Sequence, residues 1–262
     1  MIRVLTMAWV GLVEIVRRKD LYVLLVLLVA LLLVLMTVNV FSLGAVARYV
    51  ADVGLLFVWL FSIVLAVSMA GRQLPQEEAR GTIYPLLAKP LSRGQLIAGK
   101  WLGAWLASAA ATVLFYVFVF GLVRLRGWVF SERCALQAVL LHVMLLGCIT
   151  ALAIALSTRM SYGAAASVAY LAIGASFFLA PQVPVLVAHS QGPGVTVLMA
   201  LFYGLPHFNL FDLRQRLVHD WGPAPGSAVA AVLLYGAVWT AILLVLAWLG
   251  YRRKRFRRGA LG

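Results

Sequence analysis

The chain has 262 residues, of which 64% are hydrophobic and 11% are charged, and its mean hydropathy is +1.01. Soluble domains are about 45–50% apolar and roughly 25% charged, so one water-soluble core cannot hide this composition. Disordered chains are poor in leucine, valine and aromatic residues, which excludes disorder as well. The composition therefore predicts an all-α polytopic membrane protein.

The first segment, residues 1–20, contains no apolar run long enough to span a membrane. Arg3, Glu14 and Arg17 fall near one face at helical spacing, and Trp9 suits the depth of the lipid headgroups. We expect an amphipathic interfacial helix on the cytoplasmic face. The alternative is a basic flank that only sets the topology.

Six apolar runs follow, each long enough to cross the ~30 Å hydrocarbon core as a helix. They form a predicted transmembrane domain over residues 21–251 and cover residues 21–43, 53–71, 101–123, 135–156, 162–180 and 227–251. All nine prolines fall between these runs, so we expect each spanning helix to be continuous. A shorter apolar stretch, 195–205, predicts a re-entrant or interfacial helix before the last span.

Basic residues are distributed unevenly over the segments between the spans. With the N-terminus inside, sixteen of the 22 Lys and Arg residues fall in inner segments and six in outer loops. The positive-inside rule therefore predicts both termini in the cytoplasm, in the cell inner membrane. The basic cytoplasmic tail, residues 252–262, directly follows a span, so contact with anionic lipid explains it better than nucleic-acid binding.

The inner segment between the second and third spans, residues 72–100, carries the most specific pattern. Pro75, followed by Gln76, Glu77 and Glu78, has the form of a helix start, with carboxylates at the positive end of the dipole. Ser92 and Gln95 form a capping-box pattern that predicts a helix leading into the third span. Such an ordered, charged element either docks a partner or is ordered only against its own helices.

This segment resembles the ABC-2 type permease family, the membrane subunits of ATP-binding-cassette exporters. The resemblance rests on Glu77-Glu78-Ala79-Arg80-Gly81-Thr82, Leu86-Leu87-Ala88-Lys89-Pro90-Leu91-Ser92-Arg93 and Gly99-Lys100-Trp101-Leu102-Gly103. Residues 205–213 also look like the family's Pro…Phe-Asp element, so the resemblance covers essentially the whole chain. The most similar branch includes the permease of the nitrous-oxide-reductase maturation operon.

The resemblance implies that the chain forms half of a transmembrane pathway, as a homodimer or with a second permease. Two separate ABC ATPase subunits would bind below it, and a cytoplasmic coupling helix between spans 2 and 3 would seat in a groove of the ATPase. The residues that would contact the partner or shape this loop are Glu77, Glu78, Arg80, Gly81, Thr82, Pro90, Ser92 and Arg93. The substrate is not legible from the sequence.

No catalytic, cofactor or metal site is expected in the chain. The stretch from Gly94 to Lys100 matches a phosphate-binding loop, but Trp101 stands where a hydroxyl should bind Mg²⁺. Gly99 and Gly103 serve better as small residues that allow close helix packing. ATP hydrolysis is therefore expected in a partner subunit.

Two polar residues in the apolar runs, Asn39 and His142, are predicted to hydrogen-bond between helices rather than to bind ligands. Two further function classes stay open beside the permease. The chain could be a membrane anchor or scaffold that recruits a cytoplasmic partner without transport, or an intramembrane enzyme. A neighbouring gene for a stand-alone ATPase would favour the permease over the anchor.

Overall fold

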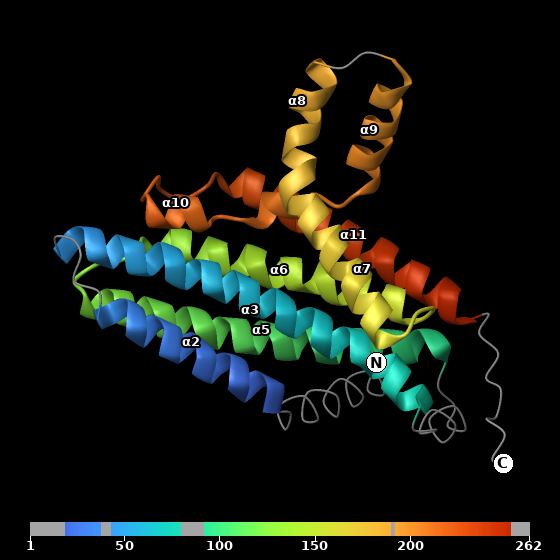
Figure 1. The fold of residues 1–262 in the computed structure, drawn as a ribbon, viewed down its shortest axis with the longest axis horizontal. Coiled ribbons are helices and arrows are strands. Elements are labelled where there is room, and N and C mark those ends of the chain that lie inside the picture. Colours follow the sequence, from blue (N-terminus) through green and yellow to red (C-terminus); the bar gives the residue numbers. More distant parts are fainter. Residues whose placement is uncertain (1–18, 38–42, 80–91, 190–191, 253–262) are drawn as a thin grey trace.

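The computed structural model describes residues 19–37, 43–79, 92–189 and 192–252, and every regular element within these ranges is a helix (Figure 1). The longer helices are α2 (Lys19–Thr37), α3 (Leu43–Ala79), α5 (Arg93–Leu125), α6 (Glu132–Ser157), α7 (Tyr162–Gly174) and α11 (Gly226–Arg252). The shorter helices are α8 (Val183–Ala188), α9 (Pro193–Gly204) and α10 (Arg214–Val218). The predicted all-α class is confirmed.

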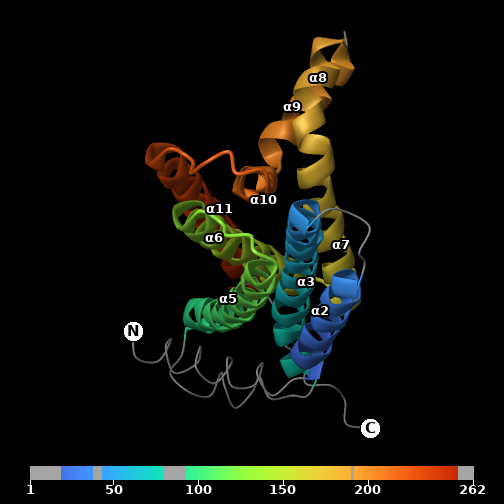
Figure 2. The ribbon, with the colours of Figure 1, turned by 90° about the vertical axis from the view of Figure 1, so that its left-hand side faces the viewer.

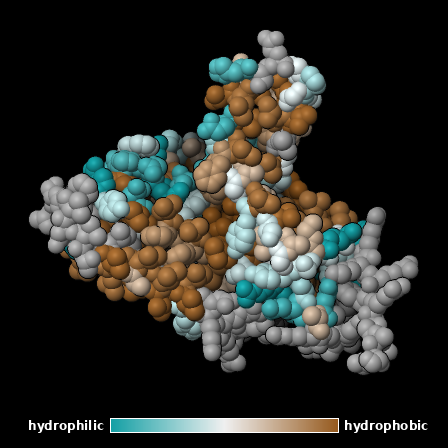
Figure 3. Space-filling view, in the orientation of Figure 1, coloured by the Kyte–Doolittle hydropathy of each residue, from teal (hydrophilic) through white to brown (hydrophobic). Residues whose placement is uncertain are grey.

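Five helical stretches in the described residues are long and apolar enough to cross a membrane. They are Ala47–Ala79, Arg93–Leu125, Glu132–Ser157, Tyr162–Ala188 and Gly226–Arg252. Even a helix of 26 residues is about 39 Å long, which exceeds the ~30 Å core. Figure 3 shows apolar side chains over the middle of the bundle, with hydrophilic ones near α10 and at the opposite end. The chain is a multi-pass membrane protein.

The bundle has two ends, the α10 end and the Glu77 end. At the α10 end, Leu217 and Val218 of α10 are buried among residues from the beginning of α3, the end of α5 and the beginning of α6. At the Glu77 end, α3 and α6 end and α5 begins. The 19-residue α2, which corresponds to the first predicted span, lies beside α3 (Figures 1 and 2).

Helices α6 and α11 run parallel and pack closely along their length. Gln137 of α6 hydrogen-bonds Ala224, just before α11, and Gly250 near the end of α11 lies against Thr158. A Cβ atom added to Gly250 would lie 2.8 Å from the Thr158 Oγ1 atom. One added to Gly236 would lie 2.9 Å from a methionine side chain of α6. A side chain at either position would therefore require its neighbour on α6 or in the turn after it to shift.

The fifth spanning helix is longer than the predicted run, 162–180. A π-helical turn, Ala175–Leu179, and a 3-10 turn, Ala180–Gln182, join α7 to α8, so that the span continues to Ala188. Pro181 and Pro184 sit in the first positions of the two segments that follow the π turn. A missing N–H is tolerated there. The prediction that no proline lies within a span was therefore wrong.

Helix α9 corresponds to the short helix predicted over 195–205, and it packs against α8 to form a hairpin that projects from the bundle (Figures 1 and 2). The axis of α9 meets that of the following Phe208–Val218 segment at 41°. Counted together as one bent span, α9 and the Phe208–Val218 segment would bring the candidate spans of the described residues from five to six.

Helix α3 differs most from its predicted boundaries. The second span was predicted over 53–71, with a separate coupling helix starting at Pro75, but α3 runs without interruption from Leu43 to Ala79. Pro75 lies inside α3 and cannot donate a hydrogen bond to the carbonyl of Gly71. The helix continues because Leu74 is fully buried against α5 and α11 and Glu77 pairs with α5. The prediction of a helix start at Pro75 was wrong.

The other boundaries shift by smaller amounts. Helix α5 begins at Arg93, so residues 93–100 of the predicted loop belong to it, and α6 and α11 extend the runs 135–156 and 227–251 by a few residues. Helix α2 begins at Lys19 and ends at Thr37, and Leu43 already belongs to α3. The predicted interfacial helix, apart from its last two residues, and the tail beyond Arg252 lie outside the described residues.

Candidate functional site

The end of α3 and the beginning of α5 flank the segment in which the coupling residues were predicted. Glu77, near the end of α3, forms an ion pair with Lys100 of α5. The two side chains are only 18% and 11% exposed, so the pair is largely shielded from water and salt. The pair therefore joins α3 to α5 directly next to this segment.

Helix α5 begins with a complete capping box. The Ser92 Oγ atom accepts a hydrogen bond from the Gln95 backbone N–H at 3.2 Å, and Gln95 Oε1 accepts one from the Ser92 N–H at 3.1 Å. These bonds satisfy two backbone donors that a helix start leaves without intrahelical partners. The capping box predicted from Ser92 and Gln95 is confirmed, and it fixes the start of α5 outside the predicted span.

Arg93 connects the start of α5 to the end of the last helix. Its Nη1 atom donates to the carbonyl oxygens of Tyr251 and Arg252, each at 2.9 Å. The carbonyls in the last turn of a helix lack intrahelical donors, and a cation is favourable at the negative end of the helix dipole. Arg93 therefore caps the C-terminal end of α11 from a neighbouring helix.

Apolar packing joins the same three helices beneath these polar contacts. Leu74 of α3, Leu96 of α5 and Tyr251 of α11 are buried in one cluster. The Arg252 guanidinium lies 5.1 Å from the centre of the Trp248 ring. Gly94 of α5 also lies close to Trp248, because a Cβ atom added to Gly94 would lie 3.5 Å from that ring. Helices α3, α5 and α11 are thus fastened together at the Glu77 end.

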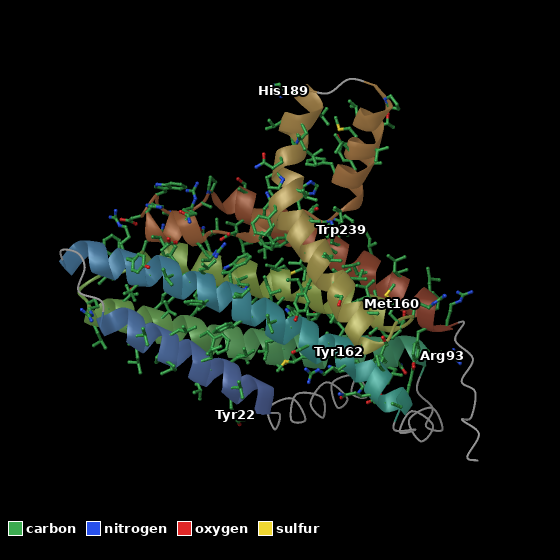
Figure 4. All side chains as sticks on the ribbon, viewed as in Figure 1. Tyr22, Arg93, Met160, Tyr162, His189 and Trp239 are labelled. Atoms are coloured by element: carbon green, nitrogen blue, oxygen red, sulfur yellow. The ribbon has the colours of Figure 1, made fainter. Side chains whose placement is uncertain are left out.

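Helix α7 joins this end through its first residue, Tyr162. The Arg72 guanidinium lies 4.8 Å from the centre of the Tyr162 ring, and a Cβ atom on Gly71 would lie 3.5 Å from the same side chain. Figure 4 labels Arg93 and Tyr162 at this end of the bundle. Four spanning helices therefore meet at the Glu77 end, where α3 ends and α5 begins.

The predicted coupling residues divide into two groups. Arg80, Gly81, Thr82 and Pro90 lie outside the described residues. Glu77, Glu78, Ser92 and Arg93 lie at the two helix ends that flank the segment. The sequence assigned Glu77 and Arg93 to a partner subunit and missed their contacts within the chain. Arg93 and Tyr251 are 158 residues apart, a separation that no local motif reports.

The resemblance of Gly94–Trp101 to a phosphate-binding loop has no counterpart in the geometry. These residues form the first two turns of α5, and Lys100 pairs with Glu77. A phosphate-binding loop instead presents a row of free backbone N–H groups from a turn after a strand. Among the described residues, no three His, Cys, Asp or Glu side chains gather as metal ligands would.

Gly99 and Gly103, the predicted packing glycines, are both buried on α5. The close contact between α5 and α6 lies at Gly147, which the sequence did not single out. The Trp101 indole N–H donates to the Gly147 carbonyl at 3.0 Å, and a Cβ atom on Gly147 would lie 3.2 Å from the Trp105 indole nitrogen. A side chain at position 147 would require the Trp105 indole, which stacks on Trp101, to shift by a few tenths of an ångström.

His142 lies at the centre of a buried polar cluster away from the Glu77 end. Its Nε2 atom is 2.8 Å from Ser62 Oγ of α3, and its Nδ1 atom is 3.1 Å from Tyr116 OH of α5. The ring stacks on Trp59, whose ring also lies 4.9 Å from the Arg214 guanidinium. The predicted role of His142 as a partner in interhelical hydrogen bonds is confirmed. Asn39 lies outside the described residues.

Comparison with known proteins agrees with this arrangement. The sequence model described as ABC-2 family transporter protein matches residues 36–249, which include all five long spans almost completely, the Glu77 end and the α8–α9 hairpin. No curated protein matches the chain. Because the match covers most of the 262 residues, the chain belongs to the ABC-2 family of transporter proteins.

Proposed function

We propose that the chain is the permease subunit of an ATP-binding-cassette exporter and forms half of the translocation pathway. It would couple to a separate ATPase subunit at the Glu77 end. Family membership supports a membrane component of a transporter, and ABC-2 permeases generally work with an ATPase subunit. The contacts that fasten α3, α5, α7 and α11 around one short segment support the coupling role.

Force applied to the segment between α3 and α5 would reach several spans at once. The shielded Glu77–Lys100 pair resists separation of α3 from α5, and Arg93 ties α5 to the end of α11. Closure of an ATPase dimer would therefore displace these helices together as a rigid body. We propose this concerted shift as the step that opens and closes the pathway.

The orientation follows from charge. Both termini would lie in the cytoplasm of a cell with an inner membrane, because sixteen of 22 basic residues fall on that side in a six-span topology. This orientation puts the Glu77 end on the side where ATP is available. Two copies, or this chain and a second permease, would enclose the pathway. Assignment to the nitrous-oxide-reductase maturation branch stays a prediction.

The chain itself would catalyse no reaction, and ATP hydrolysis would belong to the partner. This part of the proposal is supported by the helical conformation of Gly94–Trp101 and by the engagement of both ring nitrogens of His142 in hydrogen bonds. A histidine whose two nitrogens already have partners is poorly placed to act as a general base.

The test is co-expression of the tagged chain with each stand-alone ABC ATPase subunit of its source genome. After purification, the amount of recovered ATPase and its ATP turnover in nanodiscs are measured. Reversal of charge in Glu78→Lys should lower recovery of the cognate subunit by about two- to fivefold, because one partly exposed ion pair contributes little. Arg133→Gln, an exposed arginine at the α10 end, is the matched control and should leave recovery unchanged.

Two outcomes would contradict the proposal. If Glu78→Lys keeps full recovery and turnover while Arg257→Glu in the tail loses both, the tail is the docking site. If a cognate ATPase binds but the reconstituted complex moves no cargo from a panel of apolar, amphipathic and lipid-linked compounds, the chain acts as a membrane anchor instead.

A further inference from the structure

A lateral groove of about 520 Å³ lies between the C-terminal parts of α6 and α11. Its walls are Leu152 and Leu156 of α6 and Leu243, Leu246 and Leu249 of α11, and Thr158 and Arg159 lie at its end. The volume falls in the range of about 300–1,000 Å³ that is common for ligand sites. Figure 4 labels Met160, the residue that follows Arg159, at this end of the bundle.

The groove faces outward from the chain. The side chains of Leu246 and Leu249 are 53% and 39% exposed, although they belong to a helix that crosses the membrane. Such apolar surface at bilayer depth is covered by acyl chains or by another membrane helix. Its length runs along the two helices, as the hydrocarbon tail of a lipid does.

A cation stands where the groove reaches the membrane surface. Helix α6 ends at Ser157, and Arg159 follows in the turn, with an exposed side chain. No carboxylate of the described residues forms an ion pair with the Arg159 guanidinium. The groove therefore matches the two parts of a phospholipid. Its leucines suit an acyl chain, and the arginine at its end suits the phosphate, because a guanidinium binds phosphate with paired N–H donors.

Local charge favours an anionic lipid over a zwitterionic one. The negative dipole ends of α6 and α11 both lie here and would repel phosphate. Arg93 caps α11, and the Ile154 and Leu156 carbonyls of α6 accept backbone N–H bonds from residues 158–160. Arg159 is then the charged side chain that lines the groove, and a single cation there favours a headgroup with a net negative charge.

We propose that the α6–α11 groove binds one anionic phospholipid per protomer, from the leaflet at the Glu77 end. One acyl chain lies along the leucines and the phosphate contacts Arg159. The bound lipid fills the space beside the close contact of Gly250 with Thr158, so it supports the helix end that Arg93 caps. The proposal depends neither on ATPase docking nor on the direction of transport.

The test uses native mass spectrometry of the full chain after delipidation in detergent, with phosphatidylglycerol or phosphatidylcholine added back. We expect one phosphatidylglycerol to be retained per protomer in preference to phosphatidylcholine. Arg159→Gln should reduce the retained phosphatidylglycerol by about fivefold, as expected for loss of one cation near an anionic headgroup, and reduce phosphatidylcholine less, because its choline group offsets the phosphate charge. Arg133→Gln at the α10 end removes one exposed cation outside the groove and should change neither lipid.

A second variant tests the apolar wall. Leu246→Trp enlarges an exposed side chain at the groove without entering the core, so it should reduce retention of both lipids while size exclusion shows an unchanged fold. Equal retention of the two lipids, or no effect of Arg159→Gln, would overturn the proposal. So would competition by soluble glycerol 3-phosphate as effective as that by the lipid. Disulfide dimers formed by Leu246→Cys in native membranes would instead show that a second copy covers the groove.

Discussion

Ser62 and Ser68 are a matched pair of buried serines on α3. Each hydroxyl donates to the carbonyl three residues earlier, at 2.9 and 3.0 Å, but only Ser62 also contacts His142. We expect Ser62→Ala to lower the free energy of unfolding by about 1 kcal/mol, because it removes an interhelical hydrogen bond and leaves a ring nitrogen without a partner. The measurement is the thermal unfolding midpoint in detergent.

Ser68→Ala is the control for this prediction. It removes only a bond within the same helix, so its effect on the midpoint should be much smaller. Equal shifts for the two variants would mean that the Ser62–His142 contact contributes nothing beyond the local bond.

Residue roles were predictable only where a local reason exists. The role of Ser92 was legible because a capping box lies within three residues of the helix start. A histidine in an apolar run had to find hydrogen-bond partners, but their identity was hidden because Ser62 lies 80 positions away in the sequence. Gly147 was missed because the tryptophans that contact it, Trp101 and Trp105, belong to another helix.

At the scale of elements, the cap that α5 supplies to α11 gives a direct test. Arg93→Gln should speed amide hydrogen exchange in the last turn of α11 by roughly fivefold, because the terminal carbonyls lose a charged donor. Hydrogen-exchange mass spectrometry of a peptide that ends near Arg252 measures the change. Arg93→Lys keeps the charge but not both bonds, and it should restore part of the protection. Unchanged exchange in Arg93→Gln would show that the cap does not hold this turn.

Variants of the Glu77–Lys100 pair can distinguish a structural role of Glu77 from a role in docking the ATPase. Glu77→Lys puts two cations together in a mostly shielded site and should lower the free energy of unfolding by about 1–3 kcal/mol. The double variant Glu77→Lys with Lys100→Glu restores opposite charges and should recover most of the thermal stability. If the ATPase binds Glu77 itself, the double variant stays defective in binding; if both properties recover, Glu77 serves the chain alone.

Helix boundaries were least predictable at prolines. The pattern at Pro75 has every local feature of a helix start, yet burial of Leu74 and the pair with Lys100 carry α3 through it. At Pro181 the backbone changes from a π turn to a 3-10 turn, which absorbs the missing donor without ending the span. At both prolines, tertiary contacts or a change of helix type determine whether the helix continues. Neither can be predicted from the local sequence.

For the whole molecule, the all-α membrane class followed from composition, because only helices and closed barrels satisfy their backbone hydrogen bonds inside a bilayer. Six spans were predicted, and the described residues hold five helical stretches long and apolar enough to cross a membrane. Basic residues lie at both ends of the structure. Arg124, Arg133 and Arg216 belong to the α10 end, whereas Arg72, Arg93 and Arg159 belong to the Glu77 end. The positive-inside rule predicts that the Glu77 end faces the cytoplasm.

Single cysteines at the two ends test the topology after Cys134 and Cys148, both buried, are replaced by alanine. Ser161 precedes α7 at the Glu77 end, and its hydroxyl caps no backbone N–H there, so Ser161→Cys should be tolerated. His219 is exposed at the α10 end. A membrane-impermeant maleimide added to intact spheroplasts should label His219→Cys but not Ser161→Cys, and inverted vesicles should give the opposite result. The positive-inside rule sets this expectation, because sixteen basic residues fall on the Ser161 side of the six-span topology and six on the other. Labelling of Ser161→Cys from outside would reverse the orientation and remove the Glu77 end from the reach of a cytoplasmic ATPase.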